Sequence, residues 1–322
     1  MRRTIISSLL GLLVPCISIY SQDRTVDLIN SYGTLDSWCA RAVKESMLLG
    51  GETKLLYEFY GDGRTRQTKE PFNPPAGYMW RTNNVMAVIA GITKTSNTVF
   101  PERRGNGWCA RIETHIESVK ALGIINMDVT CQGAFILGAL PEPITGTDNP
   151  MSRVLYGIQF TGRPKALVFD YKADVGHETI RGTGFSKLKP MGYADYPEIA
   201  VILQKRWEDA EGNIHALRVG TGYEIVRSNI PHWKNGHRLE IHYGDITGED
   251  FYRDFMALQK GSEKTFHAIN SKGENVMVIE EGWASPGETP NVLIVKFLSS
   301  CGEAFYGGVG NTLWIDNIRL EM

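Results

Sequence analysis

The sequence predicts an all-β fold, either a sandwich or a barrel. Apolar and polar residues alternate with a period of two through most of the 322-residue chain, which is the pattern of strands with one buried face. These stretches are rich in β-branched and aromatic residues, Gly, Pro, Asn and Asp separate them, and helical periodicity is almost absent. Strands are expected at residues 38–45, 54–60, 85–92, 109–118, 124–136, 165–173, 198–206, 214–226, 239–243, 292–298 and 312–320.

One stretch departs from this alternation and predicts a helix over residues 247–260. Thr247 and Asp250 have the spacing of a capping box. Three large apolar side chains that follow would share one helical face, and Gly261 is suited to end the helix.

The longest expected loop covers residues 61–77 and contains Pro71, Pro74 and Pro75. Loops of this length in a compact domain are usually functional rims or mobile lids. Strand patterns resume on both sides of it, and the sequence contains no internal repeat or low-complexity linker. We therefore expect a single domain over residues 22–322 with a decorated rim.

The N-terminus is typical of a secretory signal peptide. Arg2 and Arg3 precede an apolar stretch over residues 5–19, which is shorter than the roughly 20 residues of a membrane-spanning helix. We expect cleavage after Ser21, so that residues 1–21 are removed. The sequence thus predicts export to the periplasm, the cell surface or the medium.

The cysteines leave two questions open. Cys16 ends the apolar stretch as a lipidated cysteine would, but Pro15 stands where a lipoprotein signal has Gly or Ala, so a lipoprotein is the alternative to a cleaved soluble chain. The other four form either two disulfides of unknown connectivity or buried free thiols. They are Cys39, Cys109, Cys131 and Cys301.

The charge balance and motifs exclude several classes of partner. With 34 Lys and Arg against 36 Asp and Glu, the formal net charge is −2, which gives no electrostatic reason to expect nucleic acid. The most apolar later stretch, residues 134–140, is too short to span a membrane. The glycine-rich residues 302–310 lack the lysine of a phosphate-binding loop, so we expect no nucleotide and no organic cofactor.

Three motifs resemble, in their order, jelly-roll carbohydrate-binding modules of the galactose-binding type. Residues 32–38 resemble the Gly-x-Phe-Glu-x-Trp opening of these modules, residues 105–112 resemble their Ser-Gly element before a strand, and residues 312–320 resemble their closing strand. The resemblance implies a galactose-binding-domain-like jelly-roll sandwich that binds carbohydrate.

Further landmarks resemble the bacterial PCMD family, the putative carbohydrate metabolism domain. They are Glu45-Ser46 with Gly50-Gly51, Trp80 with Asn83-Asn84-Val85, and the segments 96–101, 160–165, 170–172 and 299–308. The resemblance runs from about Leu35 to the C-terminus and implies an exported protein of glycan use, either carbohydrate-binding or glycosidic. Residues 249–290 depart from the family pattern and look like an insertion.

Four charged residues are expected on outward-facing positions of strands. Period two places Arg111 and Glu113 on the face opposite Ile112, and places Asp170 and Lys172 on the face opposite Phe169. Such a face would bind sugar hydroxyls or hold an acid–base pair, with Glu113, Asp170 and additionally Glu45 as the catalytic candidates. The alternative is that these residues form ordinary cross-strand ion pairs.

Three aromatic residues in loop-like surroundings are candidate sugar platforms. Trp80 follows the proline-rich loop, Trp108 lies in a glycine-rich turn, and Tyr306 lies in the glycine-rich segment before the last strand. The alternative is that each packs over the edge of the sandwich, because large aromatic side chains are mostly buried. Trp38, Trp207 and Trp314 lie within strand patterns and are expected in the core.

The resemblance to galactose-binding-type modules also implies a structural calcium ion that ties the opening strand to the closing one. Asp36 and Asp316 match the acidic positions of those two elements. Calcium prefers carboxylate and carbonyl oxygens. The alternative is that Asp316 caps a bend and that Asp36 is solvated.

These observations together predict an exported carbohydrate-binding protein of glycan or polysaccharide use, whose partner is an oligosaccharide or polysaccharide. A glycoside hydrolase is the alternative, and a surface structural or adhesion module is the second alternative. A hydrolase should show two close carboxylates in a cleft, one with a raised pKa. A binding module should show an aromatic platform without such a pair, and an adhesin a broad apolar patch.

Overall fold

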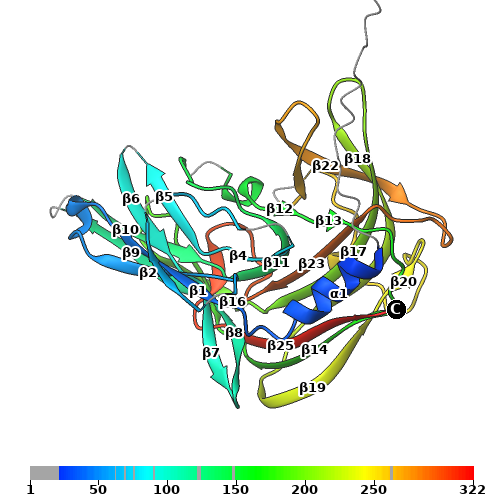
Figure 1. Ribbon diagram of the computed structural model, residues 1–322, viewed down its shortest axis with the longest axis horizontal. Coiled ribbons are helices and arrows are strands. Elements are labelled where there is room, and N and C mark those ends of the chain that lie inside the picture. Colours follow the sequence, from blue (N-terminus) through cyan, green and yellow to red (C-terminus); the bar gives the residue numbers. More distant parts are fainter. Residues whose placement is uncertain are drawn as a thin grey trace, which may run out of the picture.

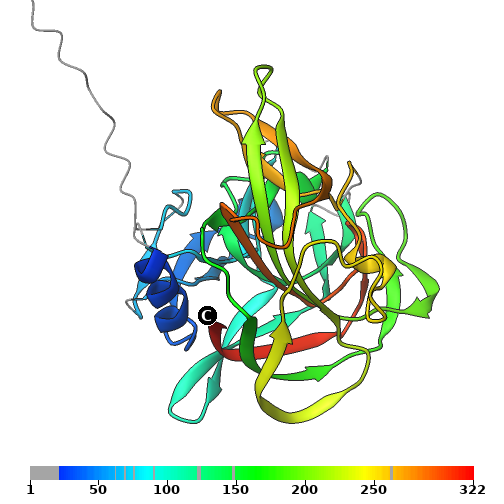
Figure 2. The same ribbon diagram turned by 90° about the vertical axis from the view of Figure 1, so that its right-hand side faces the viewer.

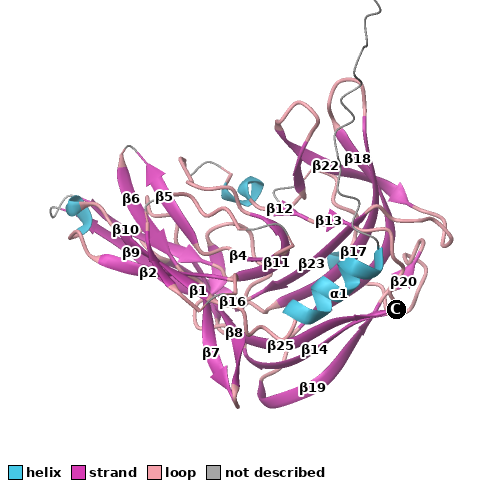
Figure 3. Cartoon of the chain, viewed as in Figure 1, coloured by secondary structure: helices cyan, strands magenta, loops and turns pink. Residues whose placement is uncertain are grey.

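Strands dominate the chain, and the predicted all-β sandwich is confirmed (Figure 3). The computed structural model describes residues 22–322 except 62, 69, 75–76, 90, 122–124, 147–148 and 262–263. The predicted signal peptide, residues 1–21, therefore lies outside the described residues. Among the described residues, no helix is both long and apolar enough to cross a membrane.

The larger sheet contains ten strands (Figure 1). Its order is β13 (Ile158–Gln159), β23 (Val292–Leu298), β17 (Glu198–Glu208), β18 (Ile214–Ile225), β22 (Asn275–Trp283), β21 (His267–Ile269), β12 (Leu155–Tyr156), β11 (Ala134–Ala139) and β4 (Trp80–Thr82), with β20 (His242–Tyr243) beside β18. Because β11 also pairs with β23, seven of these strands close into a ring.

The smaller main sheet contains five strands. Its order is β19 (Ile230–Glu240), β14 (Ala166–Asp174), β25 (Thr312–Glu321), β8 (Gly107–Glu113) and β7 (Val99–Arg104). One face packs against the ring (Figure 2). The main core lies between them, and β25, β14, β17 and β23 contribute alternate apolar residues to it. The other face is left for polar side chains.

Four smaller sheets complete the fold. Three of them lie together on the left of Figure 1. They are β1 (Cys39–Lys44) with β2 (Thr53–Glu58) and β3 (Thr65–Gln67), β5 (Val85–Ile89) with β6 (Ile92–Ser96), and β9 (His115–Ala121) with β10 (Ile125–Cys131). The fourth combines β15 (Glu178–Arg181), β16 (Lys189–Ala194) and β24 (Tyr306–Gly308).

The interior of the ring holds a second core and a buried ion pair. Phe266, Ile202 and Val278 belong to this apolar cluster. Glu280 of β22 and Arg218 of β18 form an ion pair inside it, and their side chains are 0% and 1% exposed. This pair is therefore isolated from bulk water.

A helix near the N-terminus was not expected from the sequence. Helix α1 (Gln22–Tyr32) lies along β25 (Figure 1). Asn30 accepts a hydrogen bond from Leu320 N–H at 2.8 Å, and Ile29 is fully buried. Val26, Ile29 and Tyr32 pack on the core, and three apolar positions in a mostly polar segment are too few for a helical periodicity.

The predicted helix over residues 247–260 is wrong. Only a short 3-10 turn, η3 (Asp254–Met256), occurs there. The Asp245 carboxylate accepts from the Thr247 N–H at 2.9 Å, so the donor that a capping box would use is already bound. The apolar side chains also diverge, because Phe251 stacks on His242 while Phe255 packs near Tyr223.

Several predicted strands are divided in the structure. The expected strand at residues 85–92 is the β5–β6 hairpin, and the one at 124–136 is split into β10 and β11. The one at 109–118 breaks at Thr114, whose N–H bonds Asn311 O at 2.9 Å, so β8 and β9 enter different sheets. Tertiary hydrogen bonds thus interrupt a continuous alternation pattern.

The remaining connections bear on the predicted loop, insertion and cysteines. The expected loop at residues 61–77 contains β3, which pairs in parallel with β1. The predicted insertion, residues 249–290, contributes β21 and β22 to the ring. Elsewhere in the chain, η1 (Met47–Leu49) and η2 (Pro150–Arg153) are short 3-10 turns. No two cysteines of the described residues form a disulfide with each other.

Candidate functional site

The outer face of the five-stranded sheet brings most of the predicted charged residues together. Ile112 and Phe169 are both fully buried, so their alternating neighbours point away from the core, as the sequence predicts. Two indoles that were not expected there, Trp233 and Trp314, join them. We call this surface the charged face, and it consists of Glu102, Arg104, Arg111, Glu113, Asp170, Lys172, Trp233, Trp314 and Asp316.

Arg104 is the centre of the charged face and was not singled out in the sequence. Its guanidinium donates to Asp170 Oδ2 at 2.9 Å and to Asp316 Oδ2 at 2.7 Å. Asp170 and Asp316 are paired across β14 and β25, so the register alone places them side by side. The indole of Trp233 packs 3.8 Å from the guanidinium carbon. One cation thereby fixes two carboxylates and one aromatic ring.

The two carboxylates that bind Arg104 differ in pKa. Burial raises the pKa of Asp170, but hydrogen bonds from Asn317, Gly236 and Arg104 outweigh it, so the pKa lies below its ordinary value. Burial raises the pKa of Asp316 above its ordinary value despite Arg104. Asp170 is therefore an ionised acceptor at neutral pH, and three donors already bind it.

The second half of the charged face is a more exposed network. Arg111 bonds both Glu113 and Glu102, the latter at 3.2 Å, and Lys172 lies 4.3 Å from the Trp314 ring. About a third or less of the Arg111 and Glu113 side chains is exposed, at 30% and 20%. Pairs of this kind contribute little to stability, typically about 0–1 kcal/mol. Their ordered charges and indoles remain accessible to a ligand.

A surface depression of about 480 Å³ adjoins the charged face at the turn between β7 and β8. It collects Asp36, Trp108 and Asp316 beside Arg104. Asp36 Oδ1 accepts the Trp108 backbone N–H at 2.8 Å, and this contact holds the opening segment against β8. The opening segment also contacts the closing strand, because Ile318 N–H donates to Gly33 O at 2.8 Å, so the two elements meet although Asp36 and Asp316 are 280 positions apart.

The residues of the depression do not fit a calcium ion. The Arg104 guanidinium occupies the position beside Asp316 that a cation would need, and Asp36 is engaged with a backbone N–H. Across the part of the chain that the structure describes, no group of three or more His, Cys, Asp or Glu side chains is placed to hold a metal. The calcium site at Asp36 and Asp316 remains a prediction that this arrangement does not favour.

Two of the predicted residues are core or structural groups. Trp80 is 1% exposed and stacks on Phe135 with ring centroids 5.2 Å apart, so its interpretation as a sugar platform is wrong. Glu45 is buried and accepts from both the N–H and the hydroxyl of Thr95 at 2.8 Å, with Lys94 at 3.2 Å. All three donors act on Oε1, and the side chain is 3% exposed, so Glu45 ties the end of β1 to β6 and is not accessible to a substrate.

The other aromatic predictions have mixed outcomes. Tyr306 is half-buried on β24, outside the charged face, with Arg181 above its ring at 5.8 Å. Trp38 is buried as expected. Trp207 is 41% exposed and Trp314 lies half-buried on the charged face, so the expectation that both belong to the core is wrong. The alternation of β17 and β25 would have placed Trp207 and Trp314 on the outward faces of their strands. They were expected in the core because large aromatic side chains are mostly buried.

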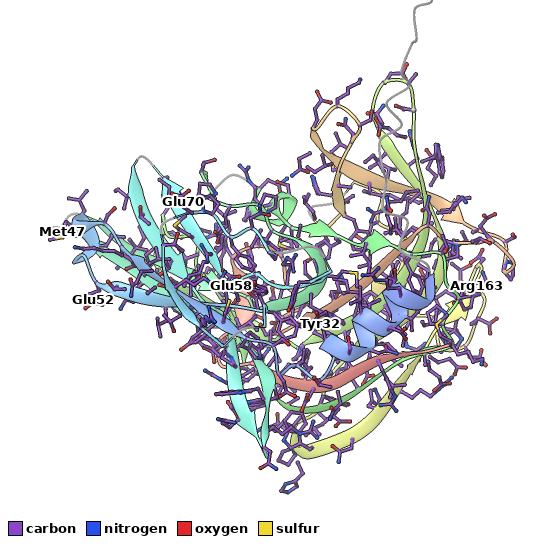
Figure 4. The ribbon with its side chains drawn as sticks, viewed as in Figure 1. Tyr32, Met47, Glu52, Glu58, Glu70 and Arg163 are labelled. Atoms are coloured by element: carbon purple, nitrogen blue, oxygen red, sulfur yellow. The ribbon has the colours of Figure 1, made fainter. Side chains whose placement is uncertain are left out.

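A second candidate site is a pocket of about 300 Å³ beneath the proline-rich loop. Its lining includes Glu58 and Glu142, which the sequence analysis did not single out. Arg41 Nη2 bonds Glu58 Oε1 at 2.6 Å and Glu142 Oε1 at 2.8 Å. Arg41 also bonds the carbonyl of Glu70 at 3.1 Å, and Figure 4 labels Glu58 below Glu70. We call this site the carboxylate pocket.

The two carboxylates of this pocket have different environments. Burial, with Glu142 acting in the same direction, raises the pKa of Glu58 to about 8 despite Arg41. Glu142 accepts from the backbone N–H groups of Met86 at 2.8 Å and Phe72 at 2.9 Å. No described residue donates to Glu58 Oε2, although the side chain is 4% exposed. Burial thus favours the protonated form of Glu58, next to a partner whose two oxygens both accept hydrogen bonds.

Comparisons with known proteins give only remote likenesses. No protein-family model and no curated protein sequence matches the chain. A solved structure from Bacteroides thetaiotaomicron VPI-5482, described as a putative glycoside hydrolase, has a TM-score of 0.43 and 16% identity over 84% of this chain and 75% of that chain. One from Bacteroides vulgatus ATCC 8482, described in the same words, has a TM-score of 0.43 and 14% identity over 84% of this chain and 87% of that chain. At this TM-score, neither likeness establishes a shared activity.

Proposed function

We propose that the protein binds carbohydrate chains on the charged face. The observation that carries the proposal is the cluster of Arg104, Asp170, Asp316 and Trp233, in which hydrogen-bonding charges are fixed beside an indole. Sugar hydroxyls need donors and acceptors in fixed directions, and the C–H face of a sugar ring packs on an aromatic plane. The adjoining depression at Trp108 extends this surface and would accommodate a chain longer than one sugar.

Glu113→Gln and Asp170→Asn are each expected to weaken glycan binding by about 1–3 kcal/mol, because charge-assisted hydrogen bonds to sugar hydroxyls are lost. A glycan array on residues 22–322 would identify a ligand, and calorimetry would give the dissociation constants. Glu211→Gln is the matched control, since Glu211 is exposed away from the charged face. Unchanged affinity in both test variants would refute this location of the site. Capture of protein partners without any glycan would favour the adhesion alternative.

Glycoside hydrolysis is a second candidate function, and the carboxylate pocket favours it. Arg41 Nη2 contacts Oε1 of both Glu58 and Glu142, at 2.6 and 2.8 Å. The distance between these two oxygens therefore cannot exceed the sum of the two contact distances. This bound on the oxygens is closer to the carboxyl separation of retaining glycosidases, about 5–5.5 Å, than to the about 6.5–9.5 Å of inverting ones. For hydrolysis, neutral Glu58 would give its proton to the leaving oxygen and Glu142 would attack the anomeric carbon. This requires Arg41 to move out of the space between the two carboxylates. Water would then release the sugar.

Product analysis on the same glycans separates binding from hydrolysis. If the carboxylate pocket is catalytic, Glu58→Gln should abolish cleavage while Asp170→Asn should alter only binding, because the two groups lie in different sites. Cleavage that survives Glu58→Gln would remove the carboxylate pocket from consideration. Intact glycan after incubation with the wild type would leave binding as the function.

We further propose that the chain is exported and belongs to the PCMD family. The support is the charged N-terminal start with its short apolar stretch, and the order of the family landmarks along the sequence. The expected mature N-terminus in periplasmic or membrane fractions is Gln22 without an acyl chain. N-terminal sequencing with intact mass determination tests this, and a diacylated Cys16 would replace the soluble form with a lipoprotein.

A further inference from the structure

A separate cavity of about 240 Å³ lies between the small sheets and the turn η2. Apolar side chains make up most of its wall, among them Val85, Leu140, Ile144, Val154 and Phe305. We call it the apolar pocket.

Most of the polar side chains in the apolar pocket already have partners. The Asn83 carboxamide oxygen accepts from Thr98 Oγ1 at 2.7 Å and from Ala134 N–H at 2.8 Å, and its nitrogen donates to Gln132 O. The Gln132 side chain donates to the carbonyl of Glu303 at 2.7 Å. Burial raises the pKa of Cys131 to about 11, so this thiol stays neutral. A neutral sugar would leave several hydroxyls without partners here, which is costly in a buried site.

Arg153 is the exception, and it carries the only charge among the described residues of the lining. It ends η2, and its Nε atom is buried without a hydrogen-bond partner. No ion pair joins its guanidinium to any described carboxylate. Arg153 is half-buried, and a guanidinium beside an apolar wall without a described counter-ion favours an anionic group there, since the attraction is stronger than in open water.

We propose that the apolar pocket binds a small amphipathic carboxylate, with a ring against the apolar wall and its anionic group on Arg153. An apolar cavity of about 150 Å³ already takes up benzene. The larger volume here has room for one ring with a short carboxylated chain. This ligand class differs from the glycan of the charged face, and the two sites are independent.

Calorimetry with 3-phenylpropanoate tests the assignment on residues 22–322. We expect saturable 1:1 binding with a dissociation constant below about 1 mM. The neutral analogue 3-phenylpropanol should bind at least about tenfold more weakly, because it lacks the charge that Arg153 would pair with. Equal binding of the acid and the alcohol, or no binding of the acid up to its solubility limit, would overturn the proposal.

Two variants localise the ligand. Arg153→Gln should weaken 3-phenylpropanoate binding at least about tenfold, and Arg319→Gln, an exposed arginine on β25, should leave it unchanged. Val154→Phe should abolish binding by filling the pocket without altering its charge. Melting temperatures would show that each variant is folded. If Val154→Phe abolishes binding while Arg153→Gln binds like the wild type, the pocket takes an apolar ligand and the anionic assignment is wrong.

Discussion

Glu280→Ala is expected to lower the free energy of unfolding by about 3–5 kcal/mol, the usual cost of breaking a buried ion pair by removing one partner. Arg218 Nε donates to Glu280 Oε1 at 2.6 Å, and the backbone N–H of Gln259 donates to Glu280 Oε2 at 2.7 Å. Without the carboxylate, the Arg218 side chain, which is 1% exposed, would carry an unpaired positive charge inside the ring. Urea denaturation followed by tryptophan fluorescence measures the loss.

The double variant Arg218→Met/Glu280→Met is the control, because removing both charges together should cost less than removing one. A loss in Glu280→Ala smaller than about 1 kcal/mol would contradict the isolation of this pair from water. Acid pH provides a second check. Burial raises the pKa of Glu280, but Arg218 and further hydrogen bonds hold it below its ordinary value. Its contribution is therefore present above the ordinary glutamate pKa and lost as the pH falls through the lowered one.

Trp80→Ala is expected to destabilise the protein by about 3–5 kcal/mol, the range for truncating a large aromatic side chain in a core. Trp80 stacks on Phe135 at an interplanar angle of 12°, and its indole N–H donates to Ile29 O at 3.4 Å. The substitution would leave a cavity between the ring, α1 and the small sheets. Urea denaturation reports the loss, and Trp80→Phe should cost less because part of the stacking survives.

Glycan affinity distinguishes this core role from a role as sugar platform. Folded Trp80→Ala protein should bind glycan as the wild type does, because the indole is 1% exposed. Trp207→Ala is the matched control, since that indole is 41% exposed and its loss should change stability little. If Trp80→Ala loses glycan affinity while its fold and stability are retained, Trp80 contacts the ligand after all.

The outward-facing charges could be predicted from the sequence because side-chain direction in a strand depends on local periodicity alone. The outward direction of Arg111, Glu113, Asp170 and Lys172 required only that Ile112 of β8 and Phe169 of β14 face the core. That Asp170 faces Asp316 required the register of β14 on β25, which periodicity does not contain. The outward position of Arg104 was not predicted, because Arg104 is the last residue of β7 and no strand was predicted there.

The carboxylate pocket could not be predicted because its residues meet only through tertiary pairing. Arg41 and Glu58 come together when β1 pairs with β2, and Glu142 arrives from a turn 101 positions beyond Arg41. The only local signal was the proline-rich loop, whose Phe72 N–H binds Glu142. The failed helix at residues 247–260 has the same origin, since contacts with β18 and β20 override its local pattern.

The closed ring of seven strands also determines where the molecule can begin to come apart. Strand β17 is flanked by β18 and β23 over most of its length, whereas β12 and β21 are joined only through the pair Leu155 and His267. A peeling motion starts where a strand is held on one side only, so the ring should open at this junction before it opens at β17. Amide protons of β17 would therefore exchange with solvent only when the whole domain opens, whereas the two-stranded ribbons β5–β6 and β9–β10 would open locally and often.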